Sequence, residues 1–83
     1  MAFHLIYTQK AVDDINKLDS VVKKRLGKKL EKFKENPLQY ANKLIDPKLG
    51  QYRFRIGNYR IIFDLEGDDI IILRVGHRSE IYK

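Results

Sequence analysis

The stretch from Tyr52 to Phe63 constrains the fold more than any other part of this chain. Apolar or aromatic residues alternate with arginines from Tyr52 to Ile56, which is typical of a half-buried strand. Gly57-Asn58 then separates this run from a second apolar run, and both residue types tolerate the positive φ of primed hairpin turns. The sequence therefore predicts a β-hairpin whose register is set by a two-residue turn.

This register places three arginines on one face of the hairpin, called the arginine face below: Arg53, Arg55 and Arg60. On the other face it pairs Ile56 with Tyr59, Phe54 with Ile61 and Tyr52 with Phe63. Arg55 lies opposite Arg60, and like charges in that position destabilise a sheet. We interpret the arginine face as a surface that binds an anion. The alternative is three solvated side chains that lie over apolar surface.

Length and composition bound the class of protein. The 83 residues suffice for one domain, 1–83, and the chain contains no cysteine that could form a disulfide or a thiolate metal site. The N-terminus lacks the pattern of a signal peptide, and no apolar run is long enough to span a bilayer. We therefore expect a soluble cytoplasmic protein with no membrane partner.

The charge balance is strongly basic, with 17 Lys and Arg against 11 Asp and Glu and a net charge of +6. Such an excess favours nucleic acid or an acidic protein as a partner. Many of the lysines fall on the polar side of a segment expected to be helical, around residues 20–34. Lys28 and Lys32 are our candidates there for contacts with RNA, and a merely solvated surface is the alternative.

The first half of the chain predicts a strand followed by two helices. Residues 3–7 alternate as in a strand, and Thr8 is placed to cap a first helix. Asp19-Ser20 ends this helix and caps a second one, whose apolar stripe is Val22, Leu26, Leu30 and Phe33. So short a break predicts a helical hairpin.

The second half predicts three strands. Residues 37–49 read as a connecting loop, with a helical turn near residues 40–44. The arginine hairpin follows, and residues 70–75 are apolar on both faces, as in a strand inside a sheet. We expect a three-residue turn before this strand, which would place Arg74 beside Ile62 on the arginine face. The order β-α-α-β-β-β gives an α+β fold with a mostly antiparallel sheet, the helical hairpin packed on one face and the other face open.

The candidate chemistry is cationic. The phosphate-binding glycine loop and the nucleophile elbow are both absent, and the two histidines are far apart in the chain, so we expect no metal and no cofactor. The candidate catalytic residues are Arg53, Arg55, Arg60, His77, Arg78 and Tyr82, with Arg74 as a further contact to RNA. Arginines stabilise charge on a phosphodiester, an imidazole transfers protons near neutral pH, and a tyrosine stacks on a base. We expect the terminal residues to complete a site on the arginine face.

Two segments resemble the RelE/ParE superfamily of bacterial and archaeal toxins. One is the hairpin from Tyr52 to Phe63, and the other is the terminal run His77-Arg78-Ser79-Glu80-Ile81-Tyr82 with the strand before it. The element order is similar over nearly the whole chain. The resemblance is nearest to the RelE-type mRNA interferases and implies a RelE-like fold.

This resemblance implies the toxin of a type II toxin–antitoxin system, a ribosome-dependent and metal-independent endoribonuclease that cleaves mRNA in the A site. The 2′-hydroxyl attacks the scissile phosphate and leaves a 2′,3′-cyclic phosphate and a 5′-hydroxyl. The implied partners are a cognate antitoxin, in an assembly that extends to a toxin–antitoxin heterotetramer, and the ribosome with its mRNA.

The resemblance also implies residue roles. Basic residues at positions 53 and 55 hold phosphate, and one of them serves as base. Arg60 stabilises the transition state. A basic residue near His77-Arg78 assists the leaving group, and Tyr82 stacks on or orients the nucleotide. Well-studied relatives carry lysines at 53 and 55, and arginine is a poor general base. Either His77 supplies the proton chemistry, or electrostatics and alignment suffice, or activity is weak. A ParE-like inhibitor of DNA gyrase and a non-toxic RNA-binding module are the alternatives.

Overall fold

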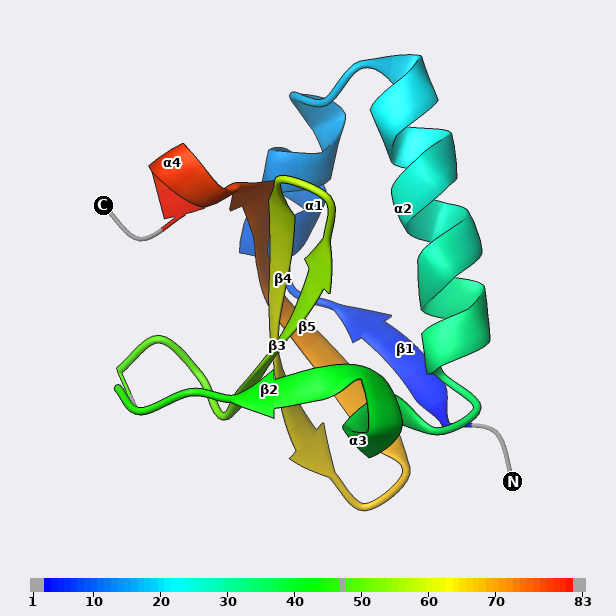
Figure 1. Cartoon of the computed structure of the whole chain (residues 1–83), viewed down its shortest axis with the longest axis vertical. Coiled ribbons are helices and arrows are strands. Elements are labelled where there is room, and N and C mark those ends of the chain that lie inside the picture. Colours follow the sequence, from blue (N-terminus) through cyan, green and yellow to red (C-terminus); the bar gives the residue numbers. More distant parts are fainter. Residues whose placement is uncertain (1–2, 47, 82–83) are drawn as a thin grey trace.

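The protein folds into one five-stranded sheet with helices packed against it (Figure 1). The computed structural model describes residues 3–46 and 48–81. The elements are β1 (His4–Tyr7), α1 (Gln9–Asn16), α2 (Ser20–Phe33), α3 (Pro37–Tyr40), β2 (Ala41–Lys43), β3 (Tyr52–Ile56), β4 (Tyr59–Glu66), β5 (Asp69–His77) and α4 (Arg78–Ile81). The strand order is β1-β5-β4-β3-β2, and all neighbours are antiparallel except β1 and β5. The predicted α+β fold is confirmed.

The β3–β4 hairpin has the predicted register. Arg55 pairs with Arg60, Phe54 with Ile61 and Tyr52 with Phe63. In the turn, Gly57 has a φ of +59°, and no non-glycine residue in the described ranges has a positive φ. A positive φ at the first turn position alone is the pattern of a type II′ turn, whose twist matches that of the strands.

Both long helices begin at the predicted caps. The Thr8 hydroxyl accepts the Ala11 N–H at 3.2 Å and donates to the Ile72 carbonyl at 2.9 Å, so this cap also ties α1 to β5. The Asp19 carboxylate accepts the Val22 N–H at 3.0 Å at the start of α2. Local polar signals therefore set both helix starts, because each cap satisfies a backbone donor that the helix leaves unpaired.

The core lies between the helices and one face of the sheet, called the helix face below. Leu26, Leu30 and Phe33 of α2 are buried there, as their spacing predicts. The Phe33 ring lies 4.8 Å from the Phe54 ring, which in turn stacks 4.3 Å from Phe63. These aromatic contacts run from α2 across β3 to β4, and each ring buries much apolar area in a small domain.

The prediction of a simple loop at residues 37–49 is wrong. Residues 37–40 form the short helix α3, and Ala41–Lys43 forms the edge strand β2, where a helical turn was expected. Ala41 pairs with Phe54, and the Tyr40 ring stacks 4.5 Å from the Phe33 ring. A three-residue strand is too short for periodicity to be visible, so only its partner β3 reveals it.

Arg74 lies opposite Ile62 as predicted, but for a different reason. The turn between β4 and β5 has two residues, 67 and 68, because Glu66 pairs with Asp69. A two-residue turn alone would direct Arg74 to the helix face. A β-bulge between Ile62 and Phe63 adds Leu73 on the opposite strand and shifts the register by one residue. The bulge therefore returns Arg74 to the arginine face.

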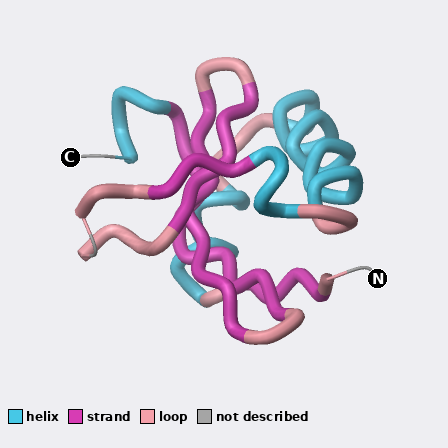
Figure 2. Tube along the Cα trace, turned by 60° about the horizontal axis from the view of Figure 1, so that its bottom comes forward, coloured by secondary structure: helices cyan, strands magenta, loops and turns pink. Residues whose placement is uncertain are grey.

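The arginine face is not open, contrary to expectation. Ile62 in its middle is fully buried, and a Cβ placed on Gly50 would lie 2.7 Å from the Ile62 side chain. Near the end of the face, Ile81 of α4 is buried against Gly76. Figure 2 shows α4 and the loop between β2 and β3 on the side of the molecule away from α2, a second thin layer.

No helix within residues 3–46 and 48–81 has the length and apolar character needed to cross a membrane.

Candidate nucleic-acid interface

The tip of the β3–β4 hairpin holds two arginines in different states. Arg60 is only 6% exposed, and its Nη1 donates to the carbonyls of Gly57 and Tyr59, each at 2.9 Å. Its partner in the register, Arg55, is exposed, and Arg53 one pleat away is half-buried. Backbone carbonyls offset part of the repulsion between Arg55 and Arg60, because they fix one guanidinium against the turn. Arg55 is thus the arginine of this face with the freest access to a ligand.

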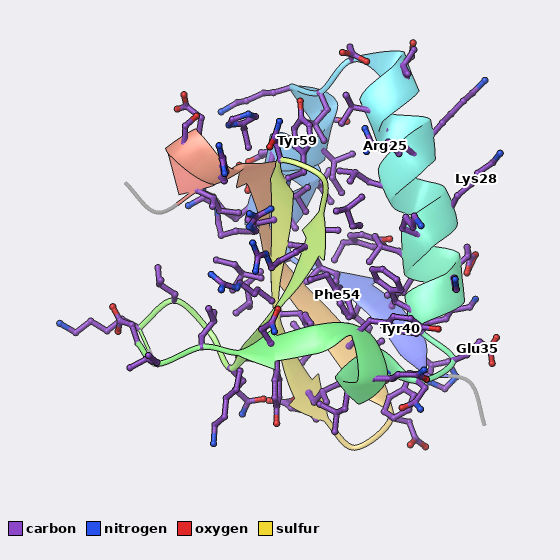
Figure 3. The ribbon with its side chains drawn as sticks, in the orientation of Figure 1. Arg25, Lys28, Glu35, Tyr40, Phe54 and Tyr59 are labelled. Carbon is purple, nitrogen blue, oxygen red and sulfur yellow. The ribbon has the colours of Figure 1, made fainter. Side chains whose placement is uncertain are left out.

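Arg25 of α2 reaches the same turn, which the sequence did not reveal. A Cβ placed on Gly57 would lie 2.9 Å from its Nη2 atom, so the guanidinium rests on the glycine (Figure 3). Arg25 is the one arginine among the lysines of α2. That difference is the only sequence signal for its position, since arginine is the better residue for planar contacts with backbone.

The end of β5 lies beside this tip, yet His77 does not lie on the arginine face. His77 pairs with Tyr59, and the two rings meet edge to face with centroids 5.5 Å apart. Paired residues share a face of the sheet, so the His77 side chain is directed to the helix face. It lies near the end of that face, where it is only half-buried. The expectation that His77 completes a site on the arginine face is therefore wrong.

Arg78 is brought to the tip by the backbone. Its N–H donates to the Asn58 carbonyl at 2.8 Å, which joins the start of α4 to the hairpin turn. Arg78 is exposed there. Tyr82, the last of the candidate catalytic residues, lies outside the described residues. The structure thus gathers Arg55, Arg60 and Arg78 around one end of the sheet. His77 lies at the same end but on the opposite face.

Arg74 is held in an ion pair. Its Nε donates to the Asp14 carboxylate of α1 at 2.7 Å, and the same carboxylate accepts the Val75 N–H at 3.0 Å. Burial by itself would raise the pKa of Asp14, but the hydrogen bonds from Arg74 and Val75 and the Arg74 charge outweigh it and lower this pKa below its usual value. Arg74 therefore ties α1 to the edge of β5, a structural role that competes with the predicted contact to RNA.

A polar hollow of about 310 Å³ opens where β5, α1 and α4 meet. His77, Tyr59, Lys17, Arg74 and Glu80 contribute to its wall. It contains charges of both signs and one imidazole. Such a wall offers donors and acceptors to a polar ligand rather than a purely cationic surface.

The two candidate lysines of α2 lie apart from the hairpin tip. Lys28 is exposed and points away from the sheet (Figure 3), and the Lys32 ammonium lies 5.7 Å from the centre of the Tyr40 ring.

Within the described ranges, no cluster of three or more His, Cys, Asp or Glu side chains has the arrangement of a metal site. The interface is therefore built from cations, one imidazole and backbone dipoles.

Comparison with known proteins agrees with this architecture. A family model described as the ParE toxin of the type II toxin–antitoxin system, parDE, matches residues 5–82. Toxin RelE3 of Methanocaldococcus jannaschii is 33% identical over 94% of this chain and 93% of its own. The mRNA interferase toxin RelE of Escherichia coli K12 is 32% identical over 99% of this chain and 92% of its own.

A solved structure shows the same fold. It is the RelB–RelE antitoxin–toxin complex from Methanococcus jannaschii, which superposes with a TM-score of 0.73 at 30% identity over 94% of this chain and 95% of that one. Sequence and fold thus agree over almost the full length. The chain belongs to the RelE/ParE superfamily, the toxins of type II toxin–antitoxin systems.

Proposed function

We propose that this toxin is an endoribonuclease that cleaves ribosome-bound mRNA in the A site. The observation that carries the proposal is the cationic end of the sheet, where exposed Arg55 and Arg78 flank the fixed Arg60. The relative from E. coli, 32% identical, is named an mRNA interferase. Action on ribosomes would place the protein in the cytoplasm.

The proposed chemistry uses the RNA's own nucleophile. The 2′-hydroxyl attacks the adjacent phosphate, the bond between phosphorus and the 5′-oxygen breaks, and a 2′,3′-cyclic phosphate forms. The proton of the 2′-hydroxyl passes by way of a phosphate oxygen to the departing 5′-oxygen, so no protein base is needed. Arg55 and Arg53 hold the phosphate, and Arg60 directs charge from the hairpin turn toward the pentavalent state. In this proposal Arg78 or His77 assists the leaving group, and Tyr82 orients the nucleotide. No metal is needed, because guanidinium groups supply the positive charge.

We also propose a cognate antitoxin as the partner that silences the site. The solved complex that this chain resembles joins RelB to RelE. A net charge of +6 suits an acidic partner chain that covers the cations and keeps RNA away. A heterotetramer of two toxins and two antitoxins is the proposed form.

A cell-free translation reaction with primer extension tests the nuclease. Wild-type protein is expected to cut mRNA at stalled codons and to leave it intact when ribosomes are omitted. Arg60→Ala is expected to cut at least about 100-fold more slowly, as when a preorganised charge donor is lost. Lys48→Ala, an exposed lysine in the β2–β3 loop, is the control for charge alone. Intact mRNA at every codon with wild-type protein would reject the proposal.

The second candidate is a ParE-like inhibitor of DNA gyrase that does not cut RNA. The description of the matching family as ParE and the arginines at positions 53 and 55 favour it. A supercoiling assay with purified gyrase separates the two. Loss of supercoiling together with intact mRNA would select the inhibitor.

A further inference from the structure

We propose that Ser79 holds His77 in the tautomer that carries its proton on Nε2, so that His77 offers an N–H donor to substrate and does not act as the general base. This inference rests on the nuclease proposed above and assigns the role of one imidazole within it. Ser79 is then a positioning residue, since it acts through His77.

The backbone of Ser79 determines the neutral form of the ring. Its N–H donates to His77 Nδ1 at 3.1 Å, in the first turn of α4. A backbone N–H is always a donor, so Nδ1 must present its lone pair. The single proton of neutral imidazole therefore resides on Nε2.

The side chain of Ser79 serves the protonated form. Its Oγ lies 2.8 Å from the same Nδ1 atom, and a hydroxyl oxygen accepts a hydrogen bond from the Nδ1–H of an imidazolium. Ser79 thus supplies a donor for the neutral ring and an acceptor for the charged one. As a result, Nε2 carries a hydrogen in both protonation states.

The surroundings restrain the ring without competing for Nδ1. Tyr59 of β4 packs its ring edge to face against the imidazole, and the N–H of Arg78 anchors the start of α4 to the hairpin turn. The charged groups that share its hollow are Asp14 of α1, Lys17 just after α1, Arg74 of β5 and Glu80 of α4. The Asp14 carboxylate accepts hydrogen bonds from Arg74 and from the Val75 N–H, which direct it away from the ring.

A fixed Nε2–H suits an oxyanion. It can donate to a non-bridging phosphate oxygen or to the 5′-oxygen that develops charge as it leaves, which is the task of a preorganised donor. A base for the 2′-hydroxyl would need a free lone pair on Nε2, and the contact with the Ser79 N–H removes that option. His77 therefore binds charge rather than accepting the nucleophile's proton.

Nitrogen NMR of the histidine rings tests the tautomer directly, without reference to activity. Above the pH at which the ring titrates, Nδ1 of His77 is expected at a pyridine-type shift and Nε2 at a pyrrole-type shift. His4 is the comparison, because it is exposed and its Nδ1 faces the Asp69 carboxylate at 3.6 Å rather than a backbone N–H. A pyrrole-type Nδ1 in His77 would overturn the inference.

Substitution of Ser79 tests which part of the residue sets the tautomer. Ser79→Ala removes the hydroxyl but keeps the backbone N–H, so the neutral His77 ring should keep its proton on Nε2 in this variant. A change of tautomer in Ser79→Ala would show that the hydroxyl, and not the backbone N–H, sets it.

Activity separates a donor from a base. The amide nitrogen of Gln reaches the position of imidazole Nε2 and donates there but cannot accept a proton. We expect His77→Gln to cleave mRNA within about 10-fold of wild type and His77→Ala to lose about 100-fold. Equal loss in both variants would assign His77 as a base and reject the inference. If wild-type protein cuts no RNA at all, the nuclease proposal fails, while the tautomer is still decided by NMR.

Discussion

Arg74 and Arg55 lie on the same face of the same sheet, and their positions differ in one respect. Arg74 meets the Asp14 carboxylate at 2.7 Å, because α1 passes the edge of β5 there. Arg55 lies at the hairpin tip, where no helix brings an acid, and it makes no ion pair within the described residues. One arginine is therefore part of the scaffold, and the other is available to an external anion.

This difference teaches that neither residue type nor strand face identifies a binding arginine. What decides is which neighbouring element passes close enough to neutralise it. Arg60 is the intermediate case, since it is buried and carbonyls of its own turn hold its guanidinium in place. The buried guanidinium of Arg60 is the better preorganised of the two, and that of exposed Arg55 is the more adaptable.

The largest expected effect opposes Arg55 to Arg74. Arg55→Ala should lower the rate of mRNA cleavage by about 100-fold, or ~2.7 kcal/mol, and leave the free energy of unfolding within about 0.5 kcal/mol. Arg74→Ala should have the opposite pattern. It should clearly lower the free energy of unfolding and should lower the rate of mRNA cleavage by less than about 10-fold. Primer extension and urea denaturation of both variants make the comparison. If Arg74→Ala impairs cleavage as much as Arg55→Ala while remaining stable, Arg74 contacts RNA as the sequence predicted.

The Asp14 carboxylate supports the scaffold side of the comparison. Asp14→Ala leaves the Val75 N–H and the Arg74 guanidinium without their acceptor, so it should lower the free energy of unfolding by about 2 kcal/mol. Asp13→Ala is the matched control, because Asp13 is exposed and accepts a hydrogen bond from the Gln9 side chain of the same helix. Equal stabilities of the two variants in urea would contradict the assignment.

This ion pair also predicts the sign of a pH effect. The pKa of Asp14 lies below its usual 3.8 in the folded protein, so the pair contributes its full stability above that value. The contribution disappears as pH falls further and the folded carboxyl gains a proton. The stability gap between wild type and Asp14→Ala should therefore be widest near neutral pH and shrink below about pH 4.

A smaller effect concerns the turn beneath Arg25. Gly57→Ala should cost about 1 kcal/mol, since φ is +59° and the new Cβ would lie 2.9 Å from the Arg25 guanidinium. Gly67→Ala is a matched control with a φ of +58° and no atom within 4 Å of its Cβ. Thermal unfolding of both variants isolates the contact. A larger loss in Gly67→Ala would mean that Arg25 does not rest on the turn.

The smallest effect is expected for the lysines of α2. Lys28 and Lys32 lie away from the hairpin tip, so Lys28→Ala and Lys32→Ala should each reduce the salt dependence of RNA or ribosome binding by about one charge and change cleavage less than about threefold. Binding measured at several salt concentrations checks this. Loss of cleavage comparable to that of Arg55→Ala would extend the interface onto the exposed surface of α2.

Much of the scaffold was predictable from local sequence. The Gly57-Asn58 turn determined the hairpin register, the Thr8 and Asp19 caps determined where the helices start, and the spacing of Leu26, Leu30 and Phe33 identified the core side of α2. Each of these signals acts over a few residues, because turns, caps and helical stripes are local chemistry. The α+β fold follows from them.

The site depended on contacts between distant segments. The bulge at Leu73, the strand β2 and the covered centre of the arginine face have no local signature. Asp14 reaches Arg74 across 60 positions of sequence, and Arg25 reaches Gly57 only after α2 packs on the sheet. The sequence by itself determined which arginines share a face of the hairpin. The tertiary structure alone decided which of them are neutralised, which are buried and which face a ligand, because these properties depend on the neighbours that packing brings.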